Sequence, residues 1–300
     1  MRSFIRSEDM KLLTLNTHSL LEENYEQKKK DFVTAVMKER PDIITLQEVN
    51  QSAEGLPADT ELLSGYNPCA GHSIPVRQDN HASQVVLLLK KEGISCSWTW
   101  LPAKIGYGKY DEGMAIISLG SRITETDSFF ISQIRDYDNW KTRKVLGIRT
   151  ADSNDWFYTV HMGWWDDEEE PFERQWRVLN ERLSEKKEAG RIWLMGDFNS
   201  PAEVRNEGYD CIMNSGWKDT WVMAGKKDSG ISVQGVIDGW KEKQLNSSDE
   251  SAGMRIDHIW CNQEVLVKCS NVVFNGKREP VVSDHFGIMI ECENGTERMH

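Results

Sequence analysis

The stretch Trp193-Leu194-Met195-Gly196-Asp197-Phe198-Asn199 decides the fold, because an apolar run leads directly into Gly, Asp and Asn. A run of this kind predicts a buried strand, here Ile192 to Met195, with polar side chains at its end. Asp197 and Asn199 are two positions apart, so in an extended chain both side chains project to the same side. Sheets of α/β proteins often present polar side chains to a shared cleft in this way. The stretch therefore predicts a site at a strand end in an α/β fold.

The same pattern recurs at other predicted strand ends. Apolar residues run into polar ones at Asn16, Gln47-Glu48, His161, Arg255-Ile256-Asp257-His258 and Ser283-Asp284-His285. One such residue alone is most often a turn residue, a helix cap or a hydrogen-bonded histidine. Together they supply the hard oxygen ligands that Mg²⁺ or Mn²⁺ requires, and histidines for proton transfer or phosphate contact. The set therefore predicts one metal-dependent site.

Many short apolar runs predict strands, and two longer segments predict helices. The predicted strands cover residues 11–15, 42–46, 84–90, 114–119, 129–134, 145–148, 156–160, 192–195, 256–260, 272–274 and 287–291. Helical spacing predicts helices over 25–40, where Pro41 stops the helix, and over 172–189, where Gly190 ends it. Because no linker divides the 300 residues, we expect one α/β domain over 1–300, with its core at about 11–291.

The composition limits the compartment and the partners. The chain carries 36 Lys and Arg against 48 Asp and Glu, a net charge of −12, which disfavours binding to a nucleic-acid backbone. The six cysteines lie far apart without a CxxC pair, which favours reduced thiols and argues against structural zinc. No apolar run has the length of a signal-peptide core or a membrane span. We therefore expect a cytoplasmic protein with no membrane partner.

The ordered series of motifs resembles the endonuclease/exonuclease/phosphatase superfamily, which includes deoxyribonuclease I, apurinic endonucleases, neutral sphingomyelinases and inositol-polyphosphate phosphatases. The resemblance spans about residues 11 to 291 and implies a deoxyribonuclease I-like four-layer α/β/β/α sandwich of two mixed β-sheets flanked by helices. It also implies one metal-dependent phosphoesterase site. The motifs are Asn16, Gln47-Glu48, Glu112-Gly113, His161, Gly196-Asp197-Phe198-Asn199, Arg255-Ile256-Asp257-His258 and Ser283-Asp284-His285.

The resemblance implies a metal group and a pair of residues for the attacking water. Asn16, Glu48 and Asp284 resemble the metal-binding group, with Glu48 as the strongest ligand. Asp197 resembles the aspartate that positions or deprotonates the water, and Asn199 resembles the amide that stabilises the transition state. Mg²⁺ is the expected cofactor, with Mn²⁺ as an alternative.

Two histidines match the family pattern as well. His285 resembles the essential histidine that Asp257 orients, and His161 resembles a second, phosphate-facing histidine with Glu112 as its partner carboxylate. Whether His285 acts as a base, an acid or an electrostatic clamp stays open, because carboxylate–His pairing is compatible with all three. Arg143 is a candidate for a phosphate contact, with an ordinary surface arginine as the alternative.

The segment after His161 indicates the substrate class. Trp164 and Trp165 are followed by five acids from Asp166 to Glu170, which would repel a nucleic-acid backbone. Paired tryptophans with carboxylates favour a sugar, whose apolar face stacks on the rings while its hydroxyls donate to acids. A solvated loop with an acid-rich helix start explains the acids but not the two tryptophans. We therefore predict a phosphomonoesterase acting on a sugar phosphate.

Two sequence runs sharpen this prediction. Asn16-Thr17-His18-Ser19 and His161-Met162-Gly163-Trp164-Trp165 resemble those of bacterial maltose-6'-phosphate phosphatases of the same superfamily, which implies maltose 6'-phosphate as a substrate. In the polar stretch 224–254, Asp238 and Trp240 are further candidates for substrate contact. The alternatives are a nuclease, a sphingomyelinase-like phosphodiesterase and an inactive binding module. The oligomeric state stays open, since exposed tryptophans also suit a dimer surface.

Overall fold

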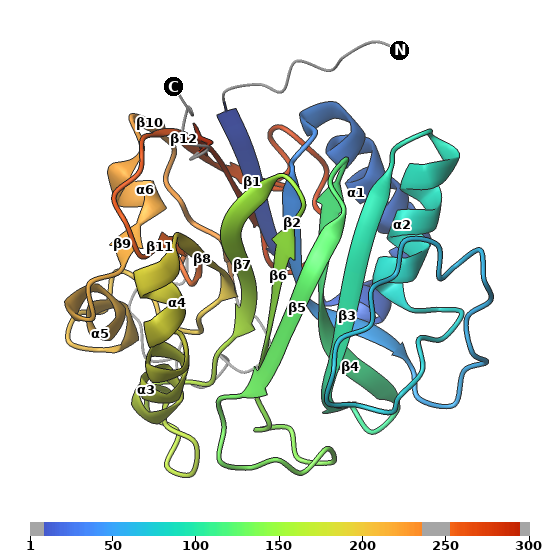
Figure 1. Cartoon of the computed structure of the whole chain (residues 1–300), viewed down its shortest axis with the longest axis horizontal. Helices are drawn as coiled ribbons and strands as arrows, with labels where there is room; N and C mark the ends of the chain where they lie inside the picture. Colours follow the sequence, from blue (N-terminus) through green and yellow to red (C-terminus); the bar gives the residue numbers. More distant parts are fainter. Residues whose placement is uncertain (1–8, 236–252, 295–300) are drawn as a thin grey trace.

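The computed structural model of the chain describes residues 9–235 and 253–294, which form two mixed sheets flanked by helices (Figure 1). The first sheet has the strand order β10 (Lys226–Lys227), β12 (Val267–Val273), β13 (Gly287–Glu293), β1 (Asp9–Asn16), β2 (Ile43–Ser52), β4 (Tyr110–Leu119) and β3 (Cys96–Gly106). The second sheet has the order β5 (Ile123–Phe130), β6 (Lys144–Thr150), β7 (Ser153–His161), β8 (Ile192–Asp197), β11 (Asp257–Cys261) and β9 (Lys218–Asp219).

Helices cover the outer face of each sheet. The helices are α1 (Tyr25–Glu39), α2 (His81–Lys91), α3 (Phe172–Arg182), α4 (Ser184–Ala189), α5 (Gly208–Asn214) and α6 (Thr220–Met223), with a short 3₁₀ turn at Ser19–Leu21. In Figure 1, α1 and α2 lie on one side of the sheets, while α3 to α6 lie on the other. None of the helices in the described ranges is both long and apolar enough to cross a membrane.

The alternation of side chains along the strands produces the layers. Leu12 of β1 and Trp193 of β8 belong to a core cluster between the two sheets. The next residue of β1, Leu13, packs instead with apolar residues of α1 and α2. On β8, Leu194 likewise packs with residues of α3 and α5, on the opposite side from Trp193. Because successive strand residues point to opposite faces, each sheet buries both faces. The predicted four-layer α/β/β/α sandwich is thus confirmed.

Several elements differ from the sequence prediction. The segment predicted as a strand over 84–90 is helix α2, which begins where the Asn80 side chain accepts a hydrogen bond from the Ser83 N–H. The predicted strand over 129–134 is also wrong, since β5 ends at Phe130. The long strand β3 was not predicted. The predicted helix over 172–189 divides at Leu183 into α3 and α4.

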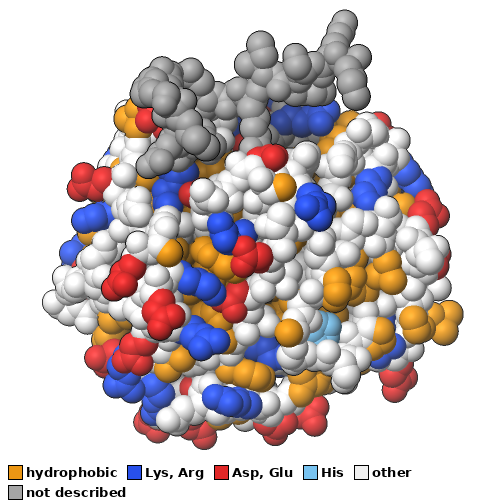
Figure 2. Space-filling model, viewed as in Figure 1, with side chains coloured by type: hydrophobic (Ala, Val, Ile, Leu, Met, Phe, Trp, Pro, Cys, Tyr) orange, Lys and Arg blue, Asp and Glu red, His pale blue; other side chains and the backbone are white. Residues whose placement is uncertain are grey.

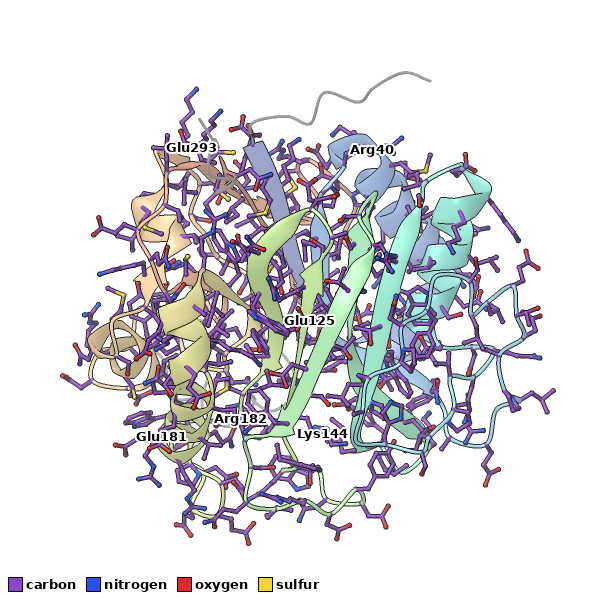
Figure 3. All side chains as sticks on the ribbon, viewed as in Figure 1. Arg40, Glu125, Lys144, Glu181, Arg182 and Glu293 are labelled. Atoms are coloured by element: carbon purple, nitrogen blue, oxygen red, sulfur yellow. The ribbon has the colours of Figure 1, made fainter. Side chains whose placement is uncertain are left out.

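Contacts between the sheets hold the lower part of the sandwich together. Lys144, the first residue of β6, is labelled in Figure 3 close to the loop that precedes this strand. Its buried ammonium donates to the carbonyl oxygen of Pro102 on β3, at 2.8 Å. Gln47 donates its amide N–H groups to Thr14 at 3.2 Å and to Thr159 of the other sheet at 2.8 Å. These contacts fix the two sheets relative to one another beside the strand ends.

Strand pairing brings the polar residues of the strand ends together. Parallel pairing of β7 with β8 places His161 opposite Asp197. Antiparallel pairing of β8 with β11 places Asp257 opposite Asp197 from the other side. Parallel pairing of β1 with β2 places Asn16 opposite Gln47 in the first sheet. Residues far apart in the sequence therefore meet where the two sheets end.

Candidate active site

A cavity of about 310 Å³ opens at these strand ends. Its walls come from both sheets and from the loops that follow them. The lining residues are His18, Glu48, Lys104, Ile105, Gly106, Tyr107, Glu112, Trp140, Arg143, His161, Trp164, Asp197, Asn199, Asp284 and His285. Most of the site residues predicted from the sequence are in this set.

Glu48 reaches the cavity from an irregular point of β2. The register between β2 and β4 shifts between Leu46 and Val49, and Glu48 itself has a φ of 52° in the left-handed region. A bulge of this kind re-aims a side chain relative to the regular pleat. Burial, together with the negative charge of Glu112, raises the pKa of the Glu48 carboxyl. A cation beside Glu48 would relieve this unfavourable charge.

Asn16 connects Glu48 with the predicted catalytic aspartate. Its amide nitrogen lies 2.9 Å from Glu48 Oε1 and 3.2 Å from Asp197 Oδ2. Asn16 is 1% exposed, so this amide is fixed behind the cavity wall. The Asn16 amide therefore links the two carboxylates and orients the Oδ2 atom of Asp197.

Asp197, Asp257 and His285 form a buried cluster. Asp257 Oδ2 lies 2.9 Å from His285 Nδ1, and His285 Nε2 lies 4.0 Å from Asp197 Oδ2. Burial disfavours the charged imidazole, but the nearby charges of Asp257 and Asp197 outweigh this effect and raise the pKa of His285 to about 10. Burial and the charge of Asp257 raise the pKa of Asp197 to about 7. The cluster therefore combines a cationic histidine with a carboxylate that is more basic than usual.

His161 differs electrostatically from His285. Its Nε2 lies 3.7 Å from Asp197 Oδ2. Burial and the positive charges of Arg143 and Lys104 hold the pKa of His161 well below its usual value. At neutral pH His161 is thus a neutral imidazole, which contributes a hydrogen bond rather than a charge.

Asn199 follows Asp197 on the loop after β8 with a φ of 47° in the left-handed region. Its backbone N–H donates to Asp197 Oδ1 at 2.8 Å, and its side-chain amide donates to the Met162 carbonyl at 2.9 Å. Asparagine tolerates this backbone conformation better than most residues. The loop therefore holds Asp197 and Asn199 together at the cavity.

Two buried cations line the cavity opposite the acids. Arg143 is only 5% exposed, so the alternative of an ordinary surface arginine is wrong. Its Nη1 donates to the Trp140 carbonyl at 2.7 Å, and its Nε is buried with no hydrogen-bond partner in the described part of the chain. Lys104 lies 3.2 Å from Glu112 Oε1, so Glu112 pairs with a lysine. Burial lowers the pKa of both cations, which favours an anion beside them.

Lys104 and Trp140 are lining residues that the sequence analysis missed. Lys104 lies in the interior of β3, a strand without a recognised motif. Trp140 lies in the loop between β5 and β6, and it is 49% exposed. A tryptophan next to basic residues in Trp140-Lys141-Thr142-Arg143 was the available signal for this loop.

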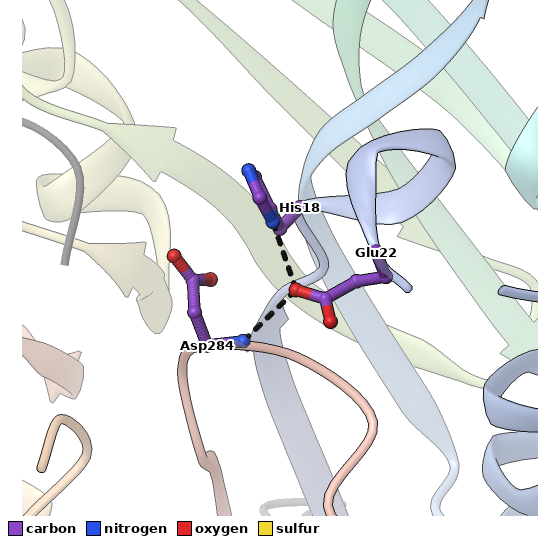
Figure 4. Close-up of side chains that lie close together, drawn as sticks. All are labelled: His18, Glu22 and Asp284. Carbon is purple, nitrogen blue, oxygen red and sulfur yellow. Dashed lines mark hydrogen bonds and ion pairs between the residues drawn. The ribbon is translucent and has the colours of Figure 1, made fainter. Parts of the chain in front are cut away.

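His18, Glu22 and Asp284 meet at another edge of the site, as Figure 4 shows. Glu22 Oε1 lies 2.8 Å from His18 Nδ1, and it accepts the backbone N–H of Asp284 at 3.1 Å. Glu22 also forms a short ion pair with Lys28. Burial disfavours the charged His18 ring, but Glu22 and Asp284 outweigh this effect and raise its pKa to about 9. Glu22, which the sequence analysis also missed, thus positions both His18 and Asp284.

Two groups in the described residues have ligand atoms close enough to hold a metal ion. One comprises His18, Glu22 and Asp284, and the other comprises Asp197, Asp257 and His285. Asp284 therefore belongs to a candidate metal group, but with His18 and Glu22 rather than with the predicted Asn16 and Glu48. Glu48 lies in the same cavity but in neither group.

The structure separates the predicted tryptophan pair. Trp164 lines the cavity, whereas Trp165 packs against Phe172, with ring centroids 6.2 Å apart. The aromatic neighbour of Trp164 is Trp140, at a centroid distance of 5.4 Å and an interplanar angle of 54°. Asp166 is exposed and is not among the lining residues. Asp238 and Trp240 lie outside the described residues.

The acids after Trp165 mainly hold the neighbouring loop. Asp167 and Glu169 both form ion pairs with Lys141, at 2.9 and 2.8 Å. Glu170 is buried and accepts the backbone N–H groups of Gln133 and Ile134. These acids therefore fasten the loop of residues 131–143, which carries Trp140 and Arg143, beside the cavity.

Comparison with known proteins places the site in a family context. The model of the "Endonuclease/Exonuclease/phosphatase family" matches residues 13–285. A solved structure of an endonuclease/exonuclease/phosphatase family protein from Leptotrichia buccalis is similar at 32% identity and a TM-score of 0.80, over 95% of this chain and 99% of that chain. No match was found among the curated proteins.

More distant solved structures share the fold. A mannosyl-6-phosphatase from Bacteroides thetaiotaomicron is 17% identical with a TM-score of 0.62, over 94% of this chain and 99% of that chain. TDP2 from D. rerio, complexed with a single-strand DNA product, is 14% identical with a TM-score of 0.59, over 95% of this chain and 98% of that chain. At these identities the likeness concerns the fold alone.

Proposed function

Because the chain belongs to the endonuclease/exonuclease/phosphatase family, we propose that it is a metal-dependent phosphomonoesterase that removes phosphate from a sugar phosphate such as maltose 6'-phosphate. One observation carries the proposal: a single small cavity joins buried cations, the Asp197 cluster and an aromatic pair. Its volume of about 310 Å³ is at the low end of small-molecule pockets, which measure about 300–1,000 Å³. A phosphorylated sugar suits this size and chemistry.

The donor set fits a divalent cation. Glu48 and Asp284 supply carboxylate oxygens at the cavity, and no lysine or arginine of the described ranges forms an ion pair with either. Burial already raises the pKa of Glu48, so a cation would stabilise its charged form. We propose that Glu48 and Asp284 hold Mg²⁺, or alternatively Mn²⁺, and that Asn16, the third predicted ligand, instead orients Glu48 through its amide N–H. When bound, the ion supplies charge neutralisation on the phosphate.

The protein residues then divide the remaining tasks. Asp197, whose pKa is raised to about 7, accepts the proton of the attacking water. His285 stays protonated beside Asp257 and stabilises the negative charge on the phosphate. Arg143 binds a phosphate oxygen, which supplies an acceptor for its buried Nε, an atom without a hydrogen-bond partner among the described residues.

His161 and Asn199 complete the phosphate-binding surface. Neutral His161 contributes a hydrogen bond at the edge of the cavity formed by β7. The amide of Asn199 is fixed by its contact with Met162, so it needs no reordering when charge develops in the transition state. Glu112 holds Lys104 in place and, as a positioning residue, tunes the positive charge that faces the phosphate.

A nuclease is the rival function that the family allows. On the face of the molecule drawn in Figure 2, basic and acidic side chains are interspersed without a continuous basic band. The net charge of −12 also disfavours a nucleic-acid backbone. The fold itself favours neither function, because the mannosyl-6-phosphatase and the DNA-bound TDP2 share it at similar TM-scores. The net charge and the small cavity support the sugar phosphatase over the nuclease.

Phosphate release and plasmid nicking measured together test the proposal. The substrates are maltose 6'-phosphate, glucose 6-phosphate and supercoiled plasmid DNA, each with Mg²⁺ and with excess chelator. We expect chelator-sensitive release of phosphate from a sugar phosphate and its loss in Asp197→Ala. Plasmid nicking with intact sugar phosphates would establish the nuclease instead. Glu173→Gln is the control, because Glu173 is an exposed acid in the first turn of α3.

A further inference from the structure

We propose that Trp140 and Trp164 form a carbohydrate-stacking subsite, in which the sugar ring of the phosphomonoester lies on Trp140 while its phosphate reaches Arg143. This inference rests on the proposed function and names the residues that select the substrate. The subsite differs from the tryptophan pair predicted from the sequence, since Trp165 packs against Phe172 and the aromatic partner of Trp164 is Trp140.

The two rings form an open corner at the cavity. Trp140 is 49% exposed and Trp164 is partly buried, and both line the cavity. Their planes are tilted by 54°, with centroids 5.4 Å apart. Rings this close and this tilted leave no slot for a flat base between them, so a ligand must stack on an outer ring face. The apolar C–H face of a pyranose suits the half-exposed ring of Trp140.

A polar atom in this corner also lacks a partner. The indole Nε1 of Trp164 is buried and has no hydrogen-bond partner among the described residues. Buried donors are rarely left unpaired, because an unsatisfied N–H costs free energy. Since this atom has almost no exposed surface, the ring faces of the pair rather than this N–H are available to a sugar.

The backbone of Trp140 is hydrogen-bonded to the two cations that face the phosphate. The backbone carbonyl of Trp140 accepts hydrogen bonds from Arg143 at 2.7 Å and from Lys104 at 3.0 Å. These bonds hold the backbone from which the Trp140 ring projects beside the two cations. A ligand in which an anion and a pyranose ring are covalently joined can occupy both parts at once.

The loop that carries Trp140 is fastened at several points. Lys141, next in the chain, forms ion pairs with Asp167 and Glu169, and its ammonium lies 5.2 Å from the centre of the Trp140 ring. Tyr137 donates its hydroxyl to Asp111 at 2.8 Å. A preformed subsite binds its ligand without the entropy cost of ordering a loop.

Three phosphate esters distinguish the subsite from the rest of the active site. We compare kcat/KM for maltose 6'-phosphate, for acyclic glycerol 3-phosphate and for adenosine 5'-monophosphate in the wild type, Trp140→Ala and Trp140→Phe. In Trp140→Ala we expect about a tenfold loss for the sugar phosphate, mainly through KM, because an aromatic contact of this kind contributes about that factor. We expect the glycerol 3-phosphate value to stay within twofold and Trp140→Phe to recover most of the loss.

A binding measurement and a matched variant support the kinetics. Calorimetric titration of maltose 6'-phosphate into the Asp197→Ala protein should lose about tenfold in affinity when Trp140→Ala is added. Trp156→Ala is the matched control, because Trp156 is a partly buried tryptophan near the opposite end of β7 from His161. Its kinetic values should stay within twofold of the wild type.

The outcomes separate this inference from the proposed function. An equal loss for maltose 6'-phosphate and glycerol 3-phosphate in Trp140→Ala would overturn the subsite but leave the sugar phosphatase standing. A larger loss for the nucleotide than for the sugar phosphate would overturn it in favour of base stacking. A wild-type protein that cleaves only DNA would instead overturn the proposed function itself.

Discussion

Asp257 acts through His285 rather than directly on the cavity. Asp257 is 1% exposed and is not a lining residue, yet its Oδ2 lies 2.9 Å from His285 Nδ1. This contact fixes the imidazole and favours its charged form, so the Nε2 edge faces Asp197. A backbone detail has a similar effect on Glu48, whose left-handed φ of 52° turns its carboxylate toward the same cavity. At the scale of single residues, the chemistry depends on fixed orientation as much as on residue type.

The Asp257→Asn substitution tests this orientation. The amide keeps the shape of the side chain but removes the charge that holds His285 protonated. We expect kcat to fall by about 10²–10³-fold, the usual cost of removing one electrostatic contact to the transition state, with little change in KM. Steady-state kinetics on the preferred sugar phosphate measure the effect. A kcat within threefold of the wild type would show that His285 does not depend on Asp257.

The Glu48→Gln substitution tests the proposed metal group. Loss of the carboxylate should raise the Mg²⁺ concentration needed for half-maximal activity by about tenfold or more, since a ligand contributes at least as much as an outer-shell partner. A Mg²⁺ titration of activity, together with calorimetric Mg²⁺ binding, measures the change. Glu173→Gln should leave both curves in place, because Glu173 is exposed on α3. Unaltered Mg²⁺ binding in Glu48→Gln would contradict the assignment.

The loop of residues 131–143 forms part of the cavity wall. Its two ends join β5 and β6 of the second sheet, and it delivers Trp140 and Arg143 to the cavity. The acids after Trp165 hold it through Lys141 and through two backbone N–H groups that donate to Glu170. In the proposed function these acids act on the substrate indirectly, by holding the loop in position.

The Glu170→Ala substitution should destabilise this loop. It leaves the N–H groups of Gln133 and Ile134 without their charged acceptor, and a hydrogen bond to a charged group contributes about 1.5–3 kcal/mol. We expect the free energy of unfolding in urea to fall by about this amount, and KM for the sugar phosphate to rise. Glu168→Ala removes an exposed acid of the same segment and should change stability by less than about 0.5 kcal/mol. Equal effects of the two substitutions would refute the role of Glu170.

At the scale of the molecule, the stability of the fold depends on pH through a buried histidine in helix α2. His81, the first residue of α2, is 5% exposed and its Nδ1 lies 3.0 Å from the Tyr25 hydroxyl. Burial and the charge of Lys29 lower the pKa of His81 to about 3. The folded chain therefore keeps this ring neutral at a pH where the unfolded chain protonates it. Its contribution to stability is complete above pH 6.5 and decreases as the pH falls toward 3.

The His81→Phe substitution tests this linkage far from the active site. One extra proton bound by the unfolded chain lowers the free energy of unfolding by up to about 1.4 kcal/mol per pH unit. We expect the plot of unfolding free energy against pH between 6.5 and 4 to be less steep in His81→Phe than in the wild type. Urea unfolding at several pH values gives both slopes. Identical slopes would show that His81 is not the group responsible.

The polar residues at the strand ends and the layered α/β class could be predicted from the sequence. Asp197 and Asn199 could be predicted because they follow a short apolar strand without interruption, and the helix over 25–40 because its apolar residues recur with helical spacing. The apolar run over 84–90 misled the prediction, because a buried helix and a buried strand share that composition and only Asn80 marks the helix start.

The contact partners of these residues could be identified only in the folded structure. Glu112 pairs with Lys104 across two neighbouring strands, and Trp164 meets Trp140 from a loop that lies 24 positions earlier in the chain. Pairings of this kind depend on strand register and on loop paths, which local periodicity does not encode. Trp165 follows Trp164 directly but packs into the core with Phe172, because neighbouring residues point in different directions. The sequence motifs thus predicted the residue types of the site, whereas tertiary packing sets their contacts and the shape of the pocket.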